Sequence, residues 1–426
     1  MSESPRTSRR VATDPTIVRH ARRRGRSAVT TALKIVSATL AVVLVSGGAV
    51  AAYALWDVAA SVKPAVTLAG QDGSSPNIDA IEGGVNLLLV GSDSRQGQGD
   101  AYGDPDVETA ELNDVTMLLH ISEDHSSASV ISFPRDLFVP IPECPKEDGS
   151  GTYNAMTSQK INTTLSYGGL ACTVLTVEAL TGLDIPFAAE VQFNGVIALS
   201  NAVGGVDVCV AEPIADPYTG TYLDAGTHTL EGAAALQFLR TRHGVGDGSD
   251  LGRISNQQVF LSSLVRTLQS SETLSDPTKL FGIAKAAASN MQLSSSLQNF
   301  NTMVSIAMAM KDIPLEQIAF IQYPNAYGSS GGQQGVLPIK TAATQLFDAI
   351  KADQKITLTG TTGVGSVADP NAPAGADPVE TTAPPADPGT ETTTPPATAE
   401  GGESVELPST IEGQTAGDYT CSKGNN

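Results

Sequence analysis

The chain has 426 residues, of which 41% are hydrophobic, and a formal net charge of −20. Its length allows more than one domain, and its hydrophobic content suffices for a folded core. Nine of the 25 basic but only two of the 45 acidic residues precede residue 57, so the remainder carries 16 basic against 43 acidic residues. A surface this acidic repels nucleic acid, whose binding needs Lys and Arg at the phosphates, and we expect no nucleic acid partner.

The first predicted element is an apolar helix. Residues 1–34 are rich in arginine, and residues 35–56 contain no charged side chain. About 20 apolar residues span a bilayer, and a basic flank stays on the cytoplasmic side. We therefore expect a cytoplasmic basic segment over 1–34, a single transmembrane anchor over 35–56 and an extracytoplasmic remainder. A cleaved signal peptide is the alternative, because AVAA offers small residues for cleavage, although signal peptides have apolar regions of only about 7–15 residues.

Strand and helix patterns alternate along the middle of the chain, after a linker over residues 57–82. Apolar runs predict strands at 85–91, 115–122, 127–134, 204–210 and 318–324, the last being the final strand expected. Helical spacing occurs at 160–180, 230–240, 251–269, 277–291, 297–311 and 341–353. This alternation favours an α/β fold in which helices cover the faces of a sheet, and we assign it to one domain over residues 83–355.

The end of the chain has a different composition. Residues 356–426 are dominated by Pro, Thr, Ala, Gly and acidic residues, which predicts a disordered tail that serves as a spacer. Cys144 and Cys172 flank one motif region and predict a disulfide in an oxidising compartment. For Cys209 two alternatives stay open, a disulfide with Cys421 in the tail or a buried free thiol.

Arginine is unevenly distributed. Past the apolar segment the chain has six arginines, and five of them occupy the motifs GSDSR (Arg95), SFPRD (Arg135), FLRTRH (Arg240 and Arg242) and LGR (Arg253). Arginine binds phosphate through two parallel hydrogen bonds. Five cations held together against an acidic background therefore indicate a phosphate site. Pairing with surface carboxylates, the alternative, accounts for one or two of these arginines better than for all five.

Aspartates accompany the arginines. Asp93 and Asp114 lie at the ends of two predicted strands. If these strands are adjacent, the two carboxylates converge and could share Mg²⁺; a turn-stabilising role is the alternative for Asp93. Asp136 follows Arg135 and would orient it or accept a proton, and Asp250 lies in the glycine-rich loop between the last two arginine motifs.

Two spacings refine this phosphate site. Arg240 and Arg242 face the same side if their segment is extended. Gln257 lies four residues after Arg253, on the same face of a predicted helix. The sequence contains no HExxH or GxxxxGK[ST] motif, which argues against those classes of metal-dependent hydrolase and nucleotide-binding protein.

Six motifs, in this order, resemble the LytR-CpsA-Psr family of cell-envelope proteins: LLLVGSDSR, the aspartate in LNDVTML, ISFPRDLFVPIP, KINTTLSYGG, LSNAVGGVDVCV and LEGAAALQFLRTRH…DLGRISNQQ. The resemblance covers residues 83–268. It implies an αβα sandwich with a central mixed sheet and an apolar groove for a polyprenyl tail. The implied activity is that of a membrane-anchored phosphotransferase, which moves a glycopolymer from polyprenyl pyrophosphate to peptidoglycan and forms a phosphodiester.

The resemblance also assigns roles to residues. Pyrophosphate would be bound by the arginines and their neighbours, namely Arg95, Arg135, Arg240, Arg242, Arg253 and Gln257. Asp93 and Asp114 would bind Mg²⁺, Arg135 would act in catalysis, and Asp136 or Asp250 would deprotonate the acceptor hydroxyl. The family often has arginine where this chain has Leu112 or Asn113, and again at Asn256, which predicts a weaker clamp. Two alternatives stay open: a polyprenyl-pyrophosphate phosphatase, and a non-catalytic protein that binds the lipid-linked glycan or the cell wall.

Overall fold

The computed structural model describes residues 28–61, 63–68, 84–99, 111–269, 276–372 and 404–425, with the single residues 102, 106, 107, 109 and 273. The chain divides into two compact units, residues 1–60 and 61–426. Parts of three predicted segments lie outside the described residues: 1–27 of the basic segment, 69–82 of the linker and 373–403 of the tail.

The N-terminal unit contains helix α1 (Ala28–Ser61). Its window Val29–Ala49 has a mean hydropathy of 1.9 and is not buried against any described part of the chain. This window is long and apolar enough to cross a bilayer. The helix fits the predicted single-pass anchor, and it extends beyond residues 35–56 at both ends.

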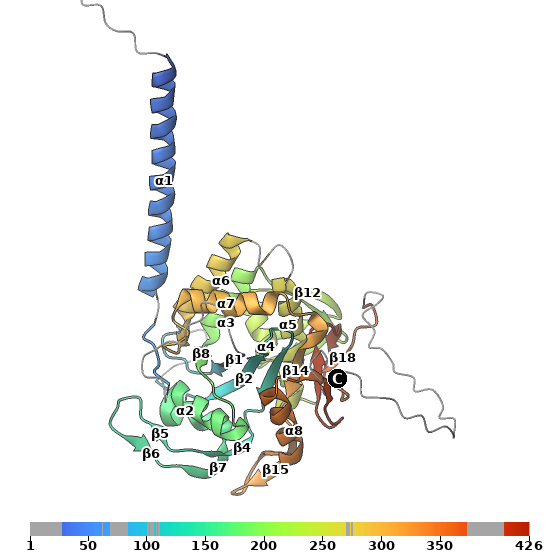
Figure 1. Cartoon of the computed structure of the whole chain (residues 1–426). Coiled ribbons are helices and arrows are strands. Elements are labelled where there is room, and N and C mark those ends of the chain that lie inside the picture. Colours follow the sequence, from blue (N-terminus) through green and yellow to red (C-terminus); the bar gives the residue numbers. More distant parts are fainter. Residues whose placement is uncertain are drawn as a thin grey trace, which may run out of the picture. The chain divides into compact units, whose positions relative to one another are not determined.

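The second unit is built around a seven-stranded mixed sheet (Figure 1). The strands lie in the order β13 (Met291–Leu293), β8 (Phe187–Val191), β1 (Val85–Ser92), β2 (Asn113–Ile121), β3 (Ala128–Phe133), β14 (Ile318–Gln322) and β20 (Gly413–Thr415). Strand β2 is antiparallel to both of its neighbours β1 and β3, whereas β8 is parallel to β1 and β14 is parallel to β3. The central mixed sheet predicted from the sequence is confirmed.

Helices cover both faces of this sheet, because successive side chains of a strand point to opposite faces. Leu88 and Val90 of β1 belong to a core with α2 (Thr164–Thr181) and α8 (Lys340–Lys351). Leu87 and Leu89 pack instead against a second core with α3 (Phe193–Val203), α5 (Asp250–Gln269), α6 (Pro277–Asn290) and α7 (Phe300–Lys311). Figure 1 shows α6 and α7 above the sheet and α2 and α8 below it, as in an αβα sandwich.

The remaining elements surround this sandwich. A four-stranded sheet has the order β12 (Gly226–Leu230), β9 (Val206–Val210), β21 (Thr420–Ser422) and β18 (Ser366–Ala368). Five strand pairs complete the described part: β4 (Phe138–Ile141) with β7 (Met156–Lys160), β5 (Cys144–Pro145) with β6 (Thr152–Tyr153), β10 (Ile214–Asp216) with β11 (Thr221–Leu223), β15 (Asn325–Ser330) with β16 (Gln333–Pro338), and β17 (Lys355–Thr357) with β19 (Ser404–Glu406). Helix α4 (Gly232–Arg240) and the 3₁₀ turns η2 (Ile161–Thr163) and η3 (Leu315–Gln317) join these elements.

The C-terminal segment, residues 404–425, is folded, which corrects the prediction of a disordered tail over 356–426. Strand β20 pairs with β14 at the edge of the main sheet, and β21 pairs with β9. Leu407 and Ile411 enter the core below the sheet. The burial of Leu407 and Ile411 and the pairing of β20 and β21 with other strands thus fold a segment whose composition is mostly polar. Strand β14 is consequently not the last strand, since β15 to β21 follow it.

Both cysteine pairs form disulfides. The Cys144–Cys172 disulfide confirms the predicted pair, and Cys209 is bonded to Cys421 over a sequence separation of 212 residues. The free-thiol alternative for Cys209 is therefore wrong. Cys209 and Cys421 face each other in the paired strands β9 and β21, a juxtaposition that depends on the folding of the C-terminal segment.

Candidate active site

Asp93 and Asp114 lie at one end of the central strands of the sheet, where β1 ends and β2 begins. Because β1 and β2 are antiparallel, the end of β1 meets the start of β2, and Asp93 Oδ1 accepts a hydrogen bond from the Leu112 amide at 2.7 Å. Burial raises the pKa of Asp93; the Leu112 hydrogen bond opposes this rise, and the nearby negative charge of Asp114 adds to it. These two neighbouring carboxylates, whose charges repel each other, provide the oxygen ligands that a hard divalent cation prefers.

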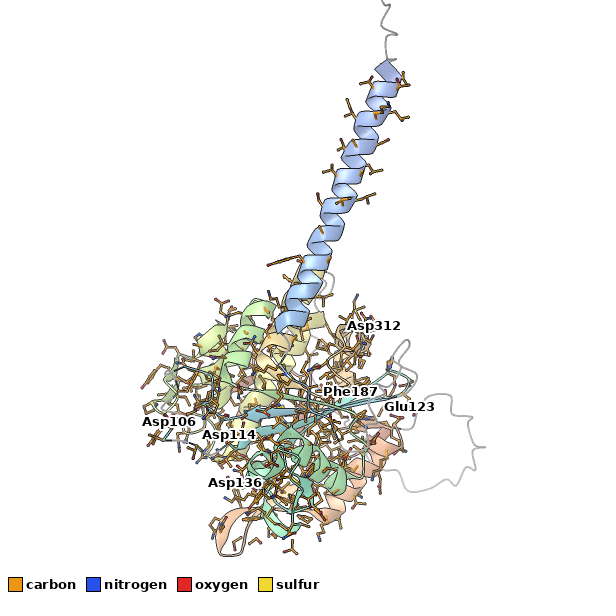
Figure 2. The ribbon with its side chains drawn as sticks, turned by 90° about the vertical axis from the view of Figure 1, so that its left-hand side faces the viewer. Asp106, Asp114, Glu123, Asp136, Phe187 and Asp312 are labelled. Atoms are coloured by element: carbon orange, nitrogen blue, oxygen red, sulfur yellow. A yellow bond between two sulfur atoms is a disulfide. The ribbon has the colours of Figure 1, made fainter. Side chains whose placement is uncertain are left out.

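Arg135 lies at the centre of an ion-pair network that joins three of the sequence motifs. Its Nη1 donates to Asp114 Oδ1 at 2.7 Å, and its Nε lies 3.7 Å from Asp136 Oδ2 and 3.8 Å from Asp250 Oδ1. Arg253 contacts two of these three aspartates, Asp250 and Asp114. Its Nη2 lies 2.6 Å from Asp250 Oδ1 and 2.6 Å from the Asp114 carbonyl oxygen. Burial alone would raise the pKa of Asp114, but Arg253 and Arg135 outweigh it and hold this pKa below its usual range. Figure 2 labels Asp114 and Asp136, which lie near each other at one end of the sheet.

Lys160, the first residue of the KINTTLSYGG motif, belongs to this network although it was not predicted as a site residue. Its Nζ donates to Asp136 Oδ1 at 2.6 Å, so Asp136 lies between two cations, Lys160 and Arg135. Lys160 ends strand β7, which pairs with β4. The helical spacing over residues 160–180 predicted a helix that begins at Lys160. The sequence therefore did not indicate strand β7, which brings Lys160 beside Asp136.

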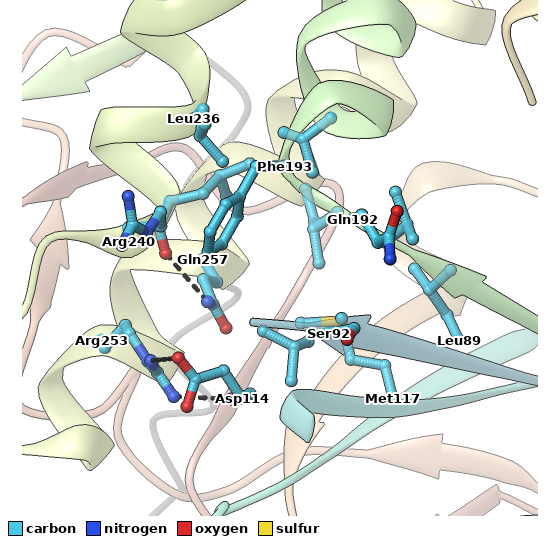
Figure 3. Close-up of a pocket in the computed structure, with 16 residues that line it drawn as sticks. Leu89, Ser92, Asp114, Met117, Gln192, Phe193, Leu236, Arg240, Arg253 and Gln257 are labelled. Carbon is cyan, nitrogen blue, oxygen red and sulfur yellow. Dashed lines mark hydrogen bonds and ion pairs between the residues drawn. The ribbon is translucent and has the colours of Figure 1, made fainter. Parts of the chain in front are cut away.

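An apolar pocket opens beside Asp114 and Arg253 (Figure 3). It lies between strands β1 and β2 and helices α3, α4 and α5, and is lined by Leu89, Gly91, Ser92, Asp114, Val115, Met117, Val191, Gln192, Phe193, Val196, Leu236, Leu239, Arg240, Arg253, Gln257 and Leu261. In Figure 3 the polar residues Arg240, Gln257, Arg253 and Asp114 gather on one side, and Leu89 and Met117 lie on the other. We call this the lipid-side pocket.

Arg240 and Gln257 are fixed in the wall of the lipid-side pocket by different contacts. The Arg240 guanidinium lies over the Phe193 ring, 4.3 Å from its centroid, while Gln257 Nε2 donates to the Leu239 carbonyl at 3.0 Å. Burial lowers the pKa of Arg240, partly offset by Asp114. Within the described residues no carboxylate forms an ion pair with Arg240, so its charge is available to a ligand.

Arg242 lines a second cavity rather than the lipid-side pocket. This cavity is lined by Pro134, Asp136, Arg242, Ser249, Asp250, Leu251, Tyr327, Gln334, Gly335 and Val336. The expectation that Arg240 and Arg242 point together is therefore not met. Helix α4 ends at Arg240, and the chain turns through the buried residue Thr241 before it reaches Arg242.

Asp216 holds this turn, and no sequence motif predicted this role. One buried carboxylate oxygen, Oδ2, accepts hydrogen bonds from Thr241 Oγ1 at 2.8 Å, from the Arg242 amide at 3.0 Å and from the His243 amide at 3.1 Å. Burial would raise the pKa of Asp216, but these hydrogen bonds leave it below its usual range. Asp216 therefore fixes the backbone conformation at Arg242.

Glu190 is a third residue, after Lys160 and Asp216, that was not predicted from the sequence. It lies on β8, directly before the pocket residue Val191, and its side chain is buried. Burial raises the pKa of Glu190 to about 7, and the charge of Glu111 adds to the rise. No strand was predicted over Phe187–Val191, and a single acid there belongs to no recognisable motif.

The remaining predicted positions have distinct surroundings. Arg95 lies within electrostatic reach of Asp93 and Arg240, although it lines neither cavity. Asn256, where the family often has arginine, is fully buried, donates to the Phe238 carbonyl at 2.8 Å and accepts from Ser422. Its side chain joins helix α5 to the C-terminal segment, so the missing arginine at this position leaves no gap in the lipid-side pocket.

Comparisons with known proteins agree with this geometry. The model of the LytR_cpsA_psr family matches residues 57–354. The chain is 30% identical over 276 residues to the cell wall biosynthesis protein LcpA of Corynebacterium glutamicum, which covers 60% of this chain and 51% of LcpA. It is 28% identical over 304 residues to the polyisoprenyl-teichoic acid–peptidoglycan teichoic acid transferase TagT of Bacillus subtilis, over 69% of this chain and 87% of TagT.

A solved structure supports the fold. The crystal structure of protein gbs0355 from Streptococcus agalactiae matches with a TM-score of 0.51 at 21% identity, over 64% of this chain and 89% of that chain. The chain spans only about half the length of LcpA. The family model, in contrast, covers well over half of the present chain and includes each arginine and aspartate of the site. The protein belongs to the LytR_cpsA_psr family.

Proposed function

We propose that this protein transfers a glycopolymer from a polyprenyl-pyrophosphate carrier to peptidoglycan and forms a phosphodiester bond. The observation that carries the proposal is the junction of an apolar pocket with a cluster of arginines and aspartates. A polyprenyl chain gains about 25 cal/mol for each Å² that it buries, while its pyrophosphate needs cations. The name of TagT describes a transferase with this class of donor and acceptor.

Four arginines supply the charge for the pyrophosphate. Arg240 and Arg242 form no ion pair with any described carboxylate, while Arg135 and Arg253 share Asp114 and Asp250. Each charged hydrogen bond to a phosphate oxygen contributes about 1.5–3 kcal/mol. Because these donors are held in place before the reaction, they stabilise the charge that develops during phosphoryl transfer without a further cost of reorganisation.

The reaction exchanges one phosphorus–oxygen bond for another. The acceptor hydroxyl oxygen attacks the phosphorus that carries the glycan, and the bond from that phosphorus to the bridging oxygen breaks. The bridging oxygen leaves with the bonding electrons as part of polyprenyl phosphate, and the hydroxyl proton passes to the carboxylate of Asp250 or Asp136. Asp93 and Asp114 would hold Mg²⁺, which neutralises charge on the leaving phosphate.

We further propose that α1 anchors the protein in the cytoplasmic membrane, with its N-terminus inside and the folded domain outside. The basic residues before the apolar helix favour this orientation. The two disulfides agree with an oxidising compartment outside the cytoplasm. In this arrangement the folded domain is on the same side of the membrane as peptidoglycan.

A reconstituted reaction tests the proposal. Full-length protein in detergent is incubated with a polyprenyl-pyrophosphoryl oligosaccharide, a peptidoglycan fragment and Mg²⁺, and mass spectrometry detects a phosphodiester-linked glycan. We expect the product with wild-type protein and with the control Lys311→Gln, whose side chain lines neither cavity, but not with Arg135→Ala. Release of glycan phosphate to water alone would instead indicate a phosphatase. Tight binding of intact donor without any turnover would indicate a lipid-glycan binding protein.

A further inference from the structure

The second cavity and the lipid-side pocket meet at the same ion-pair network. Asp114 and Arg253 line the lipid-side pocket, Asp136 and Asp250 line the second cavity, and the two cavities share no lining residue. Arg135 connects them, because it contacts Asp114 on one side and Asp136 and Asp250 on the other. A donor whose polyprenyl chain lies in the lipid-side pocket and whose pyrophosphate reaches Arg242 therefore leaves the rest of the second cavity free for another reactant.

The second cavity continues into a third one. The third cavity is lined by Leu251, Gln322, Tyr323, Pro324, Asn325, Ala326, Tyr327, Thr410 and Glu412. Leu251 and Tyr327 line both cavities, so the two form one continuous depression, which we call the hairpin groove after the β15–β16 hairpin. Thr410 and Glu412 belong to the C-terminal segment, beyond the region that the family model matches.

The hairpin is fixed beside the network by its backbone. The Val336 amide donates to the Asp136 carbonyl at 3.1 Å, and Val336 also bridges to Leu137. Gly335 permits this approach, because a Cβ there would lie 2.5 Å from the Asp136 carbonyl oxygen and 2.7 Å from the Phe138 ring. The hairpin, whose strand β15 is drawn in orange in Figure 1, therefore holds its side chains at a set distance from Asp136.

Polar atoms in the hairpin groove lack partners. Gln322 is 6% exposed, yet its Oε1 accepts no hydrogen bond from the described residues, and the same holds for Oδ1 of Asn325. In the second cavity Nε of Arg242 is likewise buried and unpaired within the described part of the chain. Buried polar groups are normally satisfied. These three atoms thus offer one donor and two acceptors to a ligand.

The charges of the hairpin groove favour an uncharged ligand. Its lining carboxylates are Asp136, Asp250 and Glu412, against the single cation Arg242. An anionic polymer would meet these carboxylates unfavourably, whereas a sugar supplies hydroxyl groups that both donate and accept. Tyr327, 67% exposed, stands where the two cavities join and offers an aromatic face for the apolar C–H face of a pyranose ring.

We propose that the hairpin groove binds the acceptor, an uncharged pyranoside chain, with one ring stacked on Tyr327 and a neighbouring hydroxyl directed at Asp136 and Asp250. This inference rests on the proposed transferase function for its reaction but not for the binding itself. Gln322 and Asn325 receive hydroxyl donors from the sugars further along the groove. The C-terminal segment completes the site through Thr410 and Glu412.

Steady-state kinetics with full-length protein test the assignment. The donor is a polyprenyl-pyrophosphoryl oligosaccharide, and the acceptor is a soluble glycan fragment of peptidoglycan. Tyr327→Ala is expected to raise the KM for the acceptor about 3- to 10-fold, the range of an aromatic stacking contact, and to leave the KM for the donor within about twofold. Tyr327→Phe keeps the ring and should keep the acceptor KM. The matched control is Tyr222→Ala, because Tyr222 is 66% exposed on β11 and lines neither cavity of the groove.

A binding measurement separates this inference from the proposed function. Titration of the same glycan fragment without donor is followed by nuclear magnetic resonance for wild-type and Tyr327→Ala protein. Weaker binding by the variant supports the groove even if the wild-type protein transfers nothing, a result that would remove only the transferase. A rise in the donor KM instead would assign the groove to the glycan of the donor. Unchanged acceptor KM and unchanged fragment binding in Tyr327→Ala would overturn the inference.

Discussion

The Cys209–Cys421 disulfide closes a far longer loop than the Cys144–Cys172 disulfide, and their contributions to stability should differ accordingly. The two bonds span 212 and 28 residues. Restricting the unfolded chain by loops of these lengths is worth about 5.4 and about 3.6 kcal/mol, respectively, in the chain-entropy estimate. We therefore predict that the double variant Cys209→Ser/Cys421→Ser loses about 2 kcal/mol more than Cys144→Ser/Cys172→Ser.

The long-range disulfide also supports the active site. The C-terminal segment donates from the Asn425 amide to the Gly244 carbonyl and accepts at the Lys423 carbonyl from the Gly246 amide, each at 3.0 Å. These bonds hold the loop that follows Arg242. Loss of the disulfide should therefore lower transfer activity before the whole domain unfolds, because the segment separates more readily from this loop.

Urea unfolding of the detergent-solubilised chain measures the difference, with far-ultraviolet circular dichroism as the signal. Fluorescence is unsuitable, since the single tryptophan, Trp56, lies in helix α1 rather than in the folded domain. Wild-type protein under the same non-reducing conditions is the reference. If removal of the Cys209–Cys421 pair costs no more free energy of unfolding than removal of the Cys144–Cys172 pair, the loop argument is refuted.

Three further predictions concern single side chains. Asp216→Ala should lower the free energy of unfolding by about 2–3 kcal/mol, because it leaves the Thr241 hydroxyl and two amides without their acceptor; retained stability in urea would contradict this. Burial raises the pKa of Glu190 from its ordinary value of 4.5 to about 7 in the folded protein, so its ionisation costs stability as pH rises from about 4.5 through 7. Glu190→Gln should therefore be up to about 3 kcal/mol more stable than wild type at pH 8 and nearly equal to it at pH 4.5, as pH-dependent unfolding would reveal. Asp93→Asn should weaken Mg²⁺ binding and so raise the metal concentration that restores half of the transfer activity after chelation; an unchanged value would remove Asp93 from the proposed metal site.

Much of the fold could be predicted because its signals are local in the sequence. The apolar runs that become β1, β2, β3, β9 and β14 and the helical spacing of α4 to α8 each lie within about 20 consecutive residues. The polar motifs directly after or before these strands indicated where the charged groups gather. The contact between Asp114 and Arg135 follows from those motifs once β2 and β3 are neighbours, and Asp250 and Arg253 reach the same two residues from helix α5.

Other features depend on residues far apart in the chain, and only the tertiary structure decided them. Lys160 reaches Asp136 through the pairing of β7 with β4, and Arg240 and Arg242 line separate cavities because Asp216 fixes the turn between them. Residues 404–425 fold because they pair with strands up to about 200 residues away in the chain. The composition of the segment does not show which strand edges and apolar surfaces it will meet. The sequence by itself thus predicted most of the charged side chains that gather in the network, since their motifs are contiguous. Their division between two cavities and the closure of the groove by the C-terminal segment required the folded chain, because both depend on long-range packing.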